Sequence, residues 1–286
     1  MGSLIDFKEI SESFKYLLDK LEKFGFYLVN PKGSEKEAIE SIIRTIEASD
    51  IEPIKKAAMI RESRSIIRKY KNKNDIYKIA LEELSKMPEQ VSVDNIEKVD
   101  DEWLSRFSEN AQHVSNEEVQ IIWGKILAEE MRDPNTIPKS LIHSLSITDR
   151  HQAELFSILC AHTVHLENNM IYTYCDYERN KQYWIDLGLD FTELMNLQEI
   201  GLITYNPLKY YSTYNKVTNN VIINLGNSQK YVLNKPLGFN NIPYGEILFS
   251  NSGLALCKAL HLPSNEIQIK HIVEGLQQDQ FTVTPI

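Results

Sequence analysis

Cysteine is scarce in this 286-residue chain, and the three that occur, Cys160, Cys175 and Cys257, lie far apart. There is no C-x-x-C pair, so neither a disulfide framework nor a zinc ribbon is indicated, and a reducing cytoplasm is the expected location. No run of residues approaches the roughly 18 apolar residues of a membrane-spanning helix, and no secretory signal segment is recognisable. We therefore expect a cytoplasmic protein without a membrane partner.

The motifs of the common enzyme classes are also missing. The chain contains no G-x-G-x-x-G, P-loop, H-E-x-x-H or G-x-S-x-G sequence. Glu130 with His143 or His151 could form an acid–base constellation, but ion pairing of such residues is far more common. We expect no catalytic residue and no cofactor, and keep an unrecognised hydrolase or nuclease as an alternative.

The sequence also contains a candidate metal-binding site. Cys160, His162, His165 and Glu167 lie close together, and thiolate and imidazole groups are zinc ligands. However, Cys160 falls on the apolar stripe of a predicted helix, and the two histidines lie near the end of that helix. The pattern therefore favours a core cysteine with surface histidines, and we expect no metal.

Charge is distributed unevenly along the chain. The formal net charge of −9 argues against a generic nucleic-acid binder. Segment 55–78 nevertheless has nine basic and two acidic residues, or +7, whereas segment 81–130 has thirteen acidic and four basic residues, or −9. The basic residues that form a candidate surface for nucleic acid or an acidic partner are Lys55, Lys56, Arg61, Arg64, Arg68, Lys69, Lys71 and Lys73.

Three interpretations of this segregation stay open. The simplest, which we favour, is two solvated helix faces of opposite sign. The second is a surface that binds a phosphate backbone or an acidic protein. The third is self-association of the basic segment with the acidic segment, which would weaken as the salt concentration rises.

The clearest structural pattern begins at residue 115. Ser115 and Glu118 predict a capping box at the start of a helix. Val119 and Trp123 begin an apolar stripe at helical spacing, and Pro134 ends the helix. By the same spacing we predict further helices at residues 4–26, 35–49, from 101, 138–145 and from 148. The first of these is amphipathic, and we expect it to dock on the body of the protein or on a second subunit.

These central helices carry a family resemblance. They contain, in this order, the patterns acidic–Trp–x–x–Arg–Phe, Ser-x-Glu-Glu-x-Gln-x-x-Trp-x-Lys-Ile-Leu-Ala-x-Glu and Leu-x-x-Leu. This order resembles a bacterial and phage family known only as a domain of unknown function. The resemblance covers about residues 100–160 and departs from the family at Glu129, where glycine is usual. It implies a bacterial or phage setting, in which we expect a role in phage–host conflict, as a defence component or as a phage-encoded inhibitor of a defence complex. The matching residues are Trp103, Arg106, Phe107, Ser115, Glu117, Glu118, Gln120, Trp123, Lys125, Ile126, Leu127, Ala128, Glu130, Pro134, Leu141, Leu145, Ala153, Leu155 and Phe156.

After residue 166 the pattern changes to mixed helix and strand. A predicted helix at 190–201, a strand at 202–205 and a hairpin around Gly226-Asn227 are typical of a winged-helix-like module. The helix contains three acidic residues and no Lys or Arg, which favours structural use or protein binding over DNA binding. A strand at 246–249 and a helix at 253–260 follow, and we expect 271–286 to be loosely structured.

The expected fold is therefore mainly α with a smaller α+β C-terminal domain, that is, a helical bundle followed by a winged-helix-like module. Met87-Pro88 and the polar residues after it suggest the first domain boundary, and the change of pattern near residue 166 suggests the second. We expect an N-terminal helical region at 1–88, a central helical domain at 89–166 and an α+β domain at 167–286.

Tyrosines gather in the C-terminal half and form a candidate protein interface, because an exposed tyrosine offers much contact area for little lost entropy. Ordinary strand residues are an equally weighted alternative. We expect a non-enzymatic interaction protein that binds protein partners and forms a homo-oligomer, with nucleic-acid binding through segment 55–78 as the alternative. The candidate interface residues are Tyr172, Tyr174, Tyr177, Tyr210, Tyr211 and Tyr214.

Overall fold

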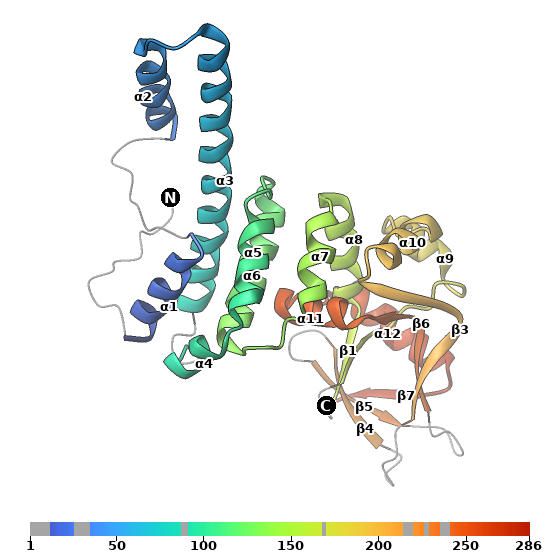
Figure 1. The fold of residues 1–286 in the computed structure, drawn as a ribbon. Helices are drawn as coiled ribbons and strands as arrows, with labels where there is room; N and C mark the ends of the chain where they lie inside the picture. Colours follow the sequence, from blue (N-terminus) through green and yellow to red (C-terminus); the bar gives the residue numbers. More distant parts are fainter. Residues whose placement is uncertain are drawn as a thin grey trace. The chain divides into compact units, whose positions relative to one another are not determined.

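The computed structural model in Figure 1 describes the chain in two compact units, residues 1–136 and 137–286. This division does not coincide with the boundaries expected at residues 88 and 166. Helices predominate, and an antiparallel sheet region lies in the C-terminal unit. None of the helices that the structure describes is long and apolar enough to cross a membrane. The described residues are 12–25, 35–86, 91–167, 170–213, 220–225, 229–234 and 241–286.

The regular secondary structure described in the first unit is all helical. Its core is aromatic: the ring of Phe107 lies 5.1 Å from that of Trp103 and 5.0 Å from that of Trp123. Gly124 lets two helices approach closely here, because a Cβ at this position would overlap the Ile79 side chain. The helices are α1 (Glu12–Lys23), α2 (Glu35–Ala48), α3 (Pro53–Ser85), α4 (Val93–Lys98), α5 (Asp101–Ala111) and α6 (Glu117–Arg132).

Helix α6 confirms the predicted central helix, but not the residue that caps it. Asn116 is the cap, since its side chain accepts hydrogen bonds from the backbone N–H groups of Glu118 and Val119 at 3.0 and 3.1 Å. The capping box predicted at Ser115 is therefore wrong by one residue. Gln120 in this helix is buried and donates to the Val114 carbonyl at 2.9 Å.

The second unit begins with a helical pair and continues as two sheets with further helices. The larger sheet has the order β2-β1-β4-β5-β7, and β3 pairs with β6 in a separate two-stranded sheet. All the pairings between these strands are antiparallel. The elements are α7 (Lys139–Ile147), α8 (Arg150–Ala161), β1 (Thr163–Leu166), β2 (Ile171–Thr173), α9 (Lys181–Asp186), α10 (Phe191–Glu199), β3 (Ile203–Thr213), β4 (Asn220–Leu225), β5 (Gln229–Asn234), β6 (Asn241–Phe249), α11 (Asn251–Leu260), α12 (Glu266–Gln278) and β7 (Thr282–Pro285).

The predicted hairpin is present as β4 and β5, but its surroundings differ from those expected. It lies inside the five-stranded sheet, and the strand that follows α10 pairs with β6 instead. The tail is also ordered: α12 and β7 occupy the residues expected to be loosely structured. Ile272 and Leu276 of α12 belong to the buried cluster of the sheet, so burial of one apolar face holds this helix in place.

Gly245 in β6 supplies the clearest backbone requirement. Its φ of 89° is left-handed, and a Cβ here would overlap the Cys175 backbone carbonyl. The N–H of the next residue, Glu246, donates to that carbonyl at 2.7 Å, so the two segments cannot separate without losing this bond. The contact ties the segment that follows β2 to β6.

We expect Gly245→Ala to lower the free energy of unfolding by about 3 kcal/mol, through strain and a backbone clash. The matched control is Gly201→Ala, which also has a positive φ of 79° but meets only the Ser144 Oγ at 3.4 Å. That control should cost about 1 kcal/mol. Urea unfolding of both variants measures the difference, and equal losses would contradict the role of the Cys175 contact.

Candidate interaction surface on the α2–α3 hairpin

The two halves of helix α3 differ in burial. Its buried residues begin at Asn72 and continue to Leu84, where the helix packs against α6. None of the residues from Pro53 to Lys71 is buried. A helix of 33 residues spans about 50 Å, so roughly half of that length has no core of its own.

Helix α2 is the element that packs against this first half, and together they form the α2–α3 hairpin (Figure 1). Ile46 is buried, whereas Ile39 and Ile43 are half-buried, and these three residues mark the side of α2 that faces α3. Two helices cannot enclose all of their apolar residues. The exposed fractions of the large apolar residues are 38% for Ile42, 79% for Ile54, 41% for Met59 and 59% for Ile66.

Three arginines form a stripe along the first half of α3. Arg61, Arg64 and Arg68 are spaced by three and four residues, so they share one side of the helix, and all three are exposed. Among the described residues none of the three forms an ion pair within 4.0 Å. In contrast, the Nζ of Lys55 lies 3.4 Å from a Glu52 carboxylate oxygen, and Lys71 lies 3.1 Å from Asp75.

The remaining predicted basic residues are less available. The Nζ of Lys56 donates to the Glu47 carbonyl at 2.7 Å, and Lys69 is half-buried. Lys73 is also half-buried, and burial lowers the pKa of its ammonium group. The arginine stripe is therefore the part of the predicted basic surface that is most open to a partner.

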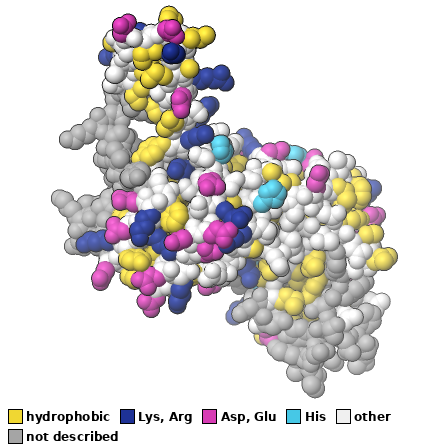
Figure 2. Space-filling view, in the orientation of Figure 1, with side chains coloured by type: hydrophobic (Ala, Val, Ile, Leu, Met, Phe, Trp, Pro, Cys, Tyr) yellow, Lys and Arg dark blue, Asp and Glu magenta, His cyan; other side chains and the backbone are white. Residues whose placement is uncertain are grey.

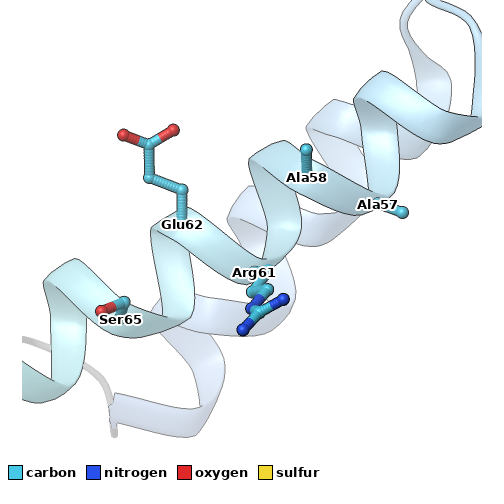
Figure 3. Close-up of a pocket in the computed structure, with 5 residues that line it drawn as sticks. All are labelled: Ala57, Ala58, Arg61, Glu62 and Ser65. Atoms are coloured by element: carbon cyan, nitrogen blue, oxygen red, sulfur yellow. The ribbon is translucent and has the colours of Figure 1, made fainter.

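A shallow hollow lies on α3 beside the arginine stripe (Figure 3). Its volume is about 490 Å³, and the small side chains of Ala57, Ala58 and Ser65 leave the space between Arg61 and Glu62. Figure 3 shows the two charged side chains pointing away from each other on either side of the helix. Such a hollow, wide open to solvent, can receive side chains of another helix but does not enclose a small molecule.

The predicted tyrosine interface is corrected by the structure. Tyr172, Tyr174 and Tyr177 are buried rather than exposed. Tyr172 stacks on Tyr244 with ring centroids 4.2 Å apart, and the Tyr174 hydroxyl donates to Asp279 at 3.1 Å. These tyrosines pack the core of the second unit because they are large and mostly apolar. The side chains of Tyr210 and Tyr211, and the whole of Tyr214, lie outside the described residues.

A buried polar cluster in the second unit was not predicted. The carboxylate of Asp176 accepts hydrogen bonds from His271 at 3.0 Å, Trp184 at 3.2 Å and Asn180 at 2.6 Å. Burial alone would raise the pKa of Asp176, but these hydrogen bonds lower it. Tyr183 stacks on His271 with ring centroids 3.8 Å apart. The sequence signal was weak, because residues from α9 and α12 meet here only through tertiary packing.

His162 adjoins this cluster and is fully buried, so its expected position on the surface was wrong. Its Nδ1 lies 2.7 Å from the Ile158 carbonyl and its Nε2 lies 2.8 Å from the Tyr183 hydroxyl. Nδ1 must therefore carry the proton and Nε2 must accept from Tyr183. Burial lowers the pKa of His162 to about 4, which keeps the imidazole neutral. The cluster joins α8, α9 and α12, and its groups satisfy one another.

The other predicted chemistry is not assembled by the described residues. Glu130 is buried in α6 and accepts from the Asn135 backbone N–H at 2.7 Å, which holds the turn after the helix. His151 lies 3.3 Å from Glu193 in an ion-pair position. Within the described part of the chain, no group of three or more His, Cys, Asp or Glu side chains could hold a metal ion.

Comparison with known proteins identifies the family to which this chain belongs. Residues 56–273 match the family model described as "Protein of unknown function (DUF2806)". The chain belongs to this family. The match extends well beyond the residues 100–160 in which the resemblance was recognised, and it includes most of α3 and much of the second unit. No curated protein and no solved structure matches this DUF2806 chain.

The low pKa of His162 makes stability depend on pH. Between about pH 6.5 and pH 4 the unfolded chain binds a proton that the folded chain excludes, so stability falls by roughly 2–3 kcal/mol as the pH drops through this window. Denaturant unfolding at several pH values measures this slope. His162→Gln should flatten it, and His143→Gln, at an exposed position, should keep it. An unchanged slope in His162→Gln would contradict the buried neutral imidazole.

Proposed function

We propose that this protein is a non-enzymatic interaction protein, and that the first half of α3 binds a partner protein. The observation that carries the proposal is found on one 19-residue stretch without a buried residue. This stretch combines exposed apolar side chains with exposed arginines that form no ion pair with another described residue. Isolated apolar residues on a surface are ordinary, but a helix half that lacks a core gains stability when another element covers it.

The apolar side chains supply the affinity in this proposal. Ile54 is 79% exposed and Ile66 is 59% exposed, so a partner could remove most of each side chain from water. Full burial of such a side chain contributes about 1.5–3 kcal/mol. Hydrophobic side chains and Lys or Arg side chains both gather over the hairpin in Figure 2, which is the pattern of an apolar contact with a charged rim.

The arginine stripe supplies the specificity. Guanidinium groups pair with carboxylates in a two-bond geometry and lose little hydration in doing so, which suits them to protein interfaces. Arg61, Arg64 and Arg68 therefore fit a partner helix or loop with acidic residues, and the hollow at Ala57, Ala58 and Ser65 fits its side chains. We infer that the partner surface is acidic and partly apolar.

Nucleic acid is the second candidate ligand for the same stripe, because three exposed arginines in a row can contact successive phosphates. One observation favours protein. Ile54, seven residues before Arg61 and therefore on the same side of the helix, is 79% exposed and apolar, and it gives a phosphate nothing to bind.

Affinity capture from a bacterial lysate with the immobilised full-length chain tests the proposal. The variant Ile54→Ser/Ile66→Ser should lose a specific retained protein, because the apolar contact is gone. The matched control is Ile267→Ser in α12, which changes an isoleucine that is 70% exposed on the other unit and should retain that protein.

Two results would contradict the proposal. One is identical retention of every protein by the wild type and the Ile54→Ser/Ile66→Ser variant. The other is retained nucleic acid, seen as excess absorbance at 260 nm, that Arg61→Glu/Arg64→Glu/Arg68→Glu abolishes and the apolar variant keeps. That second result would show that this surface binds nucleic acid instead of protein.

A further inference from the structure

We propose that the α2–α3 hairpin pairs with the same hairpin of a second copy of this chain, with the two α3 helices antiparallel about a two-fold axis close to Met59. This inference rests on the proposed function and names the partner for one flank of the hairpin. The flank is made by Lys55, Met59, Glu62 and Ile66.

Helical spacing puts these four residues together. They follow one another at intervals of four, three and four residues, so they form a single row along α3. The side of α3 that faces α2 is a different one, marked by the half-buried Ile60 and Ile67. At 100° per residue, the row lies about a third of a turn to one side of the face marked by Ile60 and Ile67, and the arginine stripe lies about a quarter turn to the other side.

Helix α2 adds an apolar residue to the same flank. Its α3-facing side is set by Ile39, Ile43 and Ile46, and Ile42 lies one step around the helix from that side. Because α2 runs antiparallel to α3, this step points toward the flank of Met59 and Ile66. The flank thus presents three partly exposed apolar side chains, at 38%, 41% and 59% exposure, from two helices.

The charges on this row make the flank complementary to itself. In this row Lys55 lies on one side of Met59 and Glu62 lies on the other side. A two-fold axis near residues 58 and 59 sets Lys55 of one copy opposite Glu62 of the other, and the symmetry makes this pair twice. A parallel arrangement would instead set Lys55 against Lys55 and Glu62 against Glu62, which is repulsive.

The charged groups on the row can exchange their partners at little cost. Lys55 is paired with Glu52 at 3.4 Å, but the two side chains are 68% and 71% exposed, and such surface pairs contribute little. The arginine stripe lies on the opposite flank, so like charges of the two copies stay apart in this pairing. A four-helix arrangement of two hairpins is a common way to bury apolar rows of this kind.

Sedimentation velocity of the full-length protein over a range of concentrations tests the pairing. The wild type should show a reversible monomer–dimer equilibrium. Lys55→Glu and Glu62→Lys should each raise the dimer Kd by about tenfold or more, because each creates two repulsive pairs. The double variant Lys55→Glu/Glu62→Lys should return the Kd to within about threefold of wild type, because both pairs are restored with reversed polarity.

Lys78→Glu is the matched control, because it reverses an exposed lysine in the other half of the same helix and should leave the Kd unchanged. A wild type that stays monomeric at all concentrations would overturn the pairing, and so would a double variant no better than the single ones. If the wild type is monomeric but still captures a protein through Ile54 and Ile66, the proposed function stands and only the choice of partner fails.

Discussion

The close approach of α3 and α6 at Gly124 is the contact on which the first unit depends. Because a side chain there would overlap Ile79, glycine lets the second half of α3 lie flat against α6, beside the aromatic core of Phe107 and Trp123. That packing fixes the direction of a rigid 33-residue helix. The first half of α3 then extends past this core with α2 beside it, and its exposed apolar and basic residues are a consequence of this geometry.

The two units use buried polar groups in different ways. In the first unit a buried lysine, Lys20, donates to the backbone carbonyls of Ile96 and Val99 at 2.9 and 2.8 Å and so ties α1 to the region of α4. In the second unit the side chains around Asp176 and His162 bond to one another and join three helices. Satisfied groups of this kind specify one packing arrangement, whereas the hairpin surface has exposed charges and exposed apolar residues that a partner can contact.

Much of the helical fold could be predicted from the sequence, because periodicity and capping are local. The helices near 35–49 and 115–132 were placed correctly to within about two residues. The pairing of β3 with β6 and the helix α12 could not be foreseen, since both depend on contacts between residues far apart in the chain. The tyrosines were misjudged for the same reason: composition gives no information on which side of a strand or turn meets the core.

The candidate surface was only half visible in the sequence. The run of Lys and Arg was plain, but the sequence alone could not tell which part of α3 would be covered. Periodicity treats Ile54 and Ile66 as ordinary helix residues, and only the packing of α6 against the second half shows that they remain exposed. The functional interpretation therefore depends on where the core ends along α3.

Amide hydrogen exchange along α3 tests most directly the claim that its first half lacks a core and is completed by association. In dilute solution we expect residues 53–71 to exchange much faster than residues 72–85, and to become protected as the protein concentration rises or a partner binds, while 72–85 stay unchanged. Equal and concentration-independent protection of both halves would contradict the account, because it would mean that the first half is already complete in a single chain.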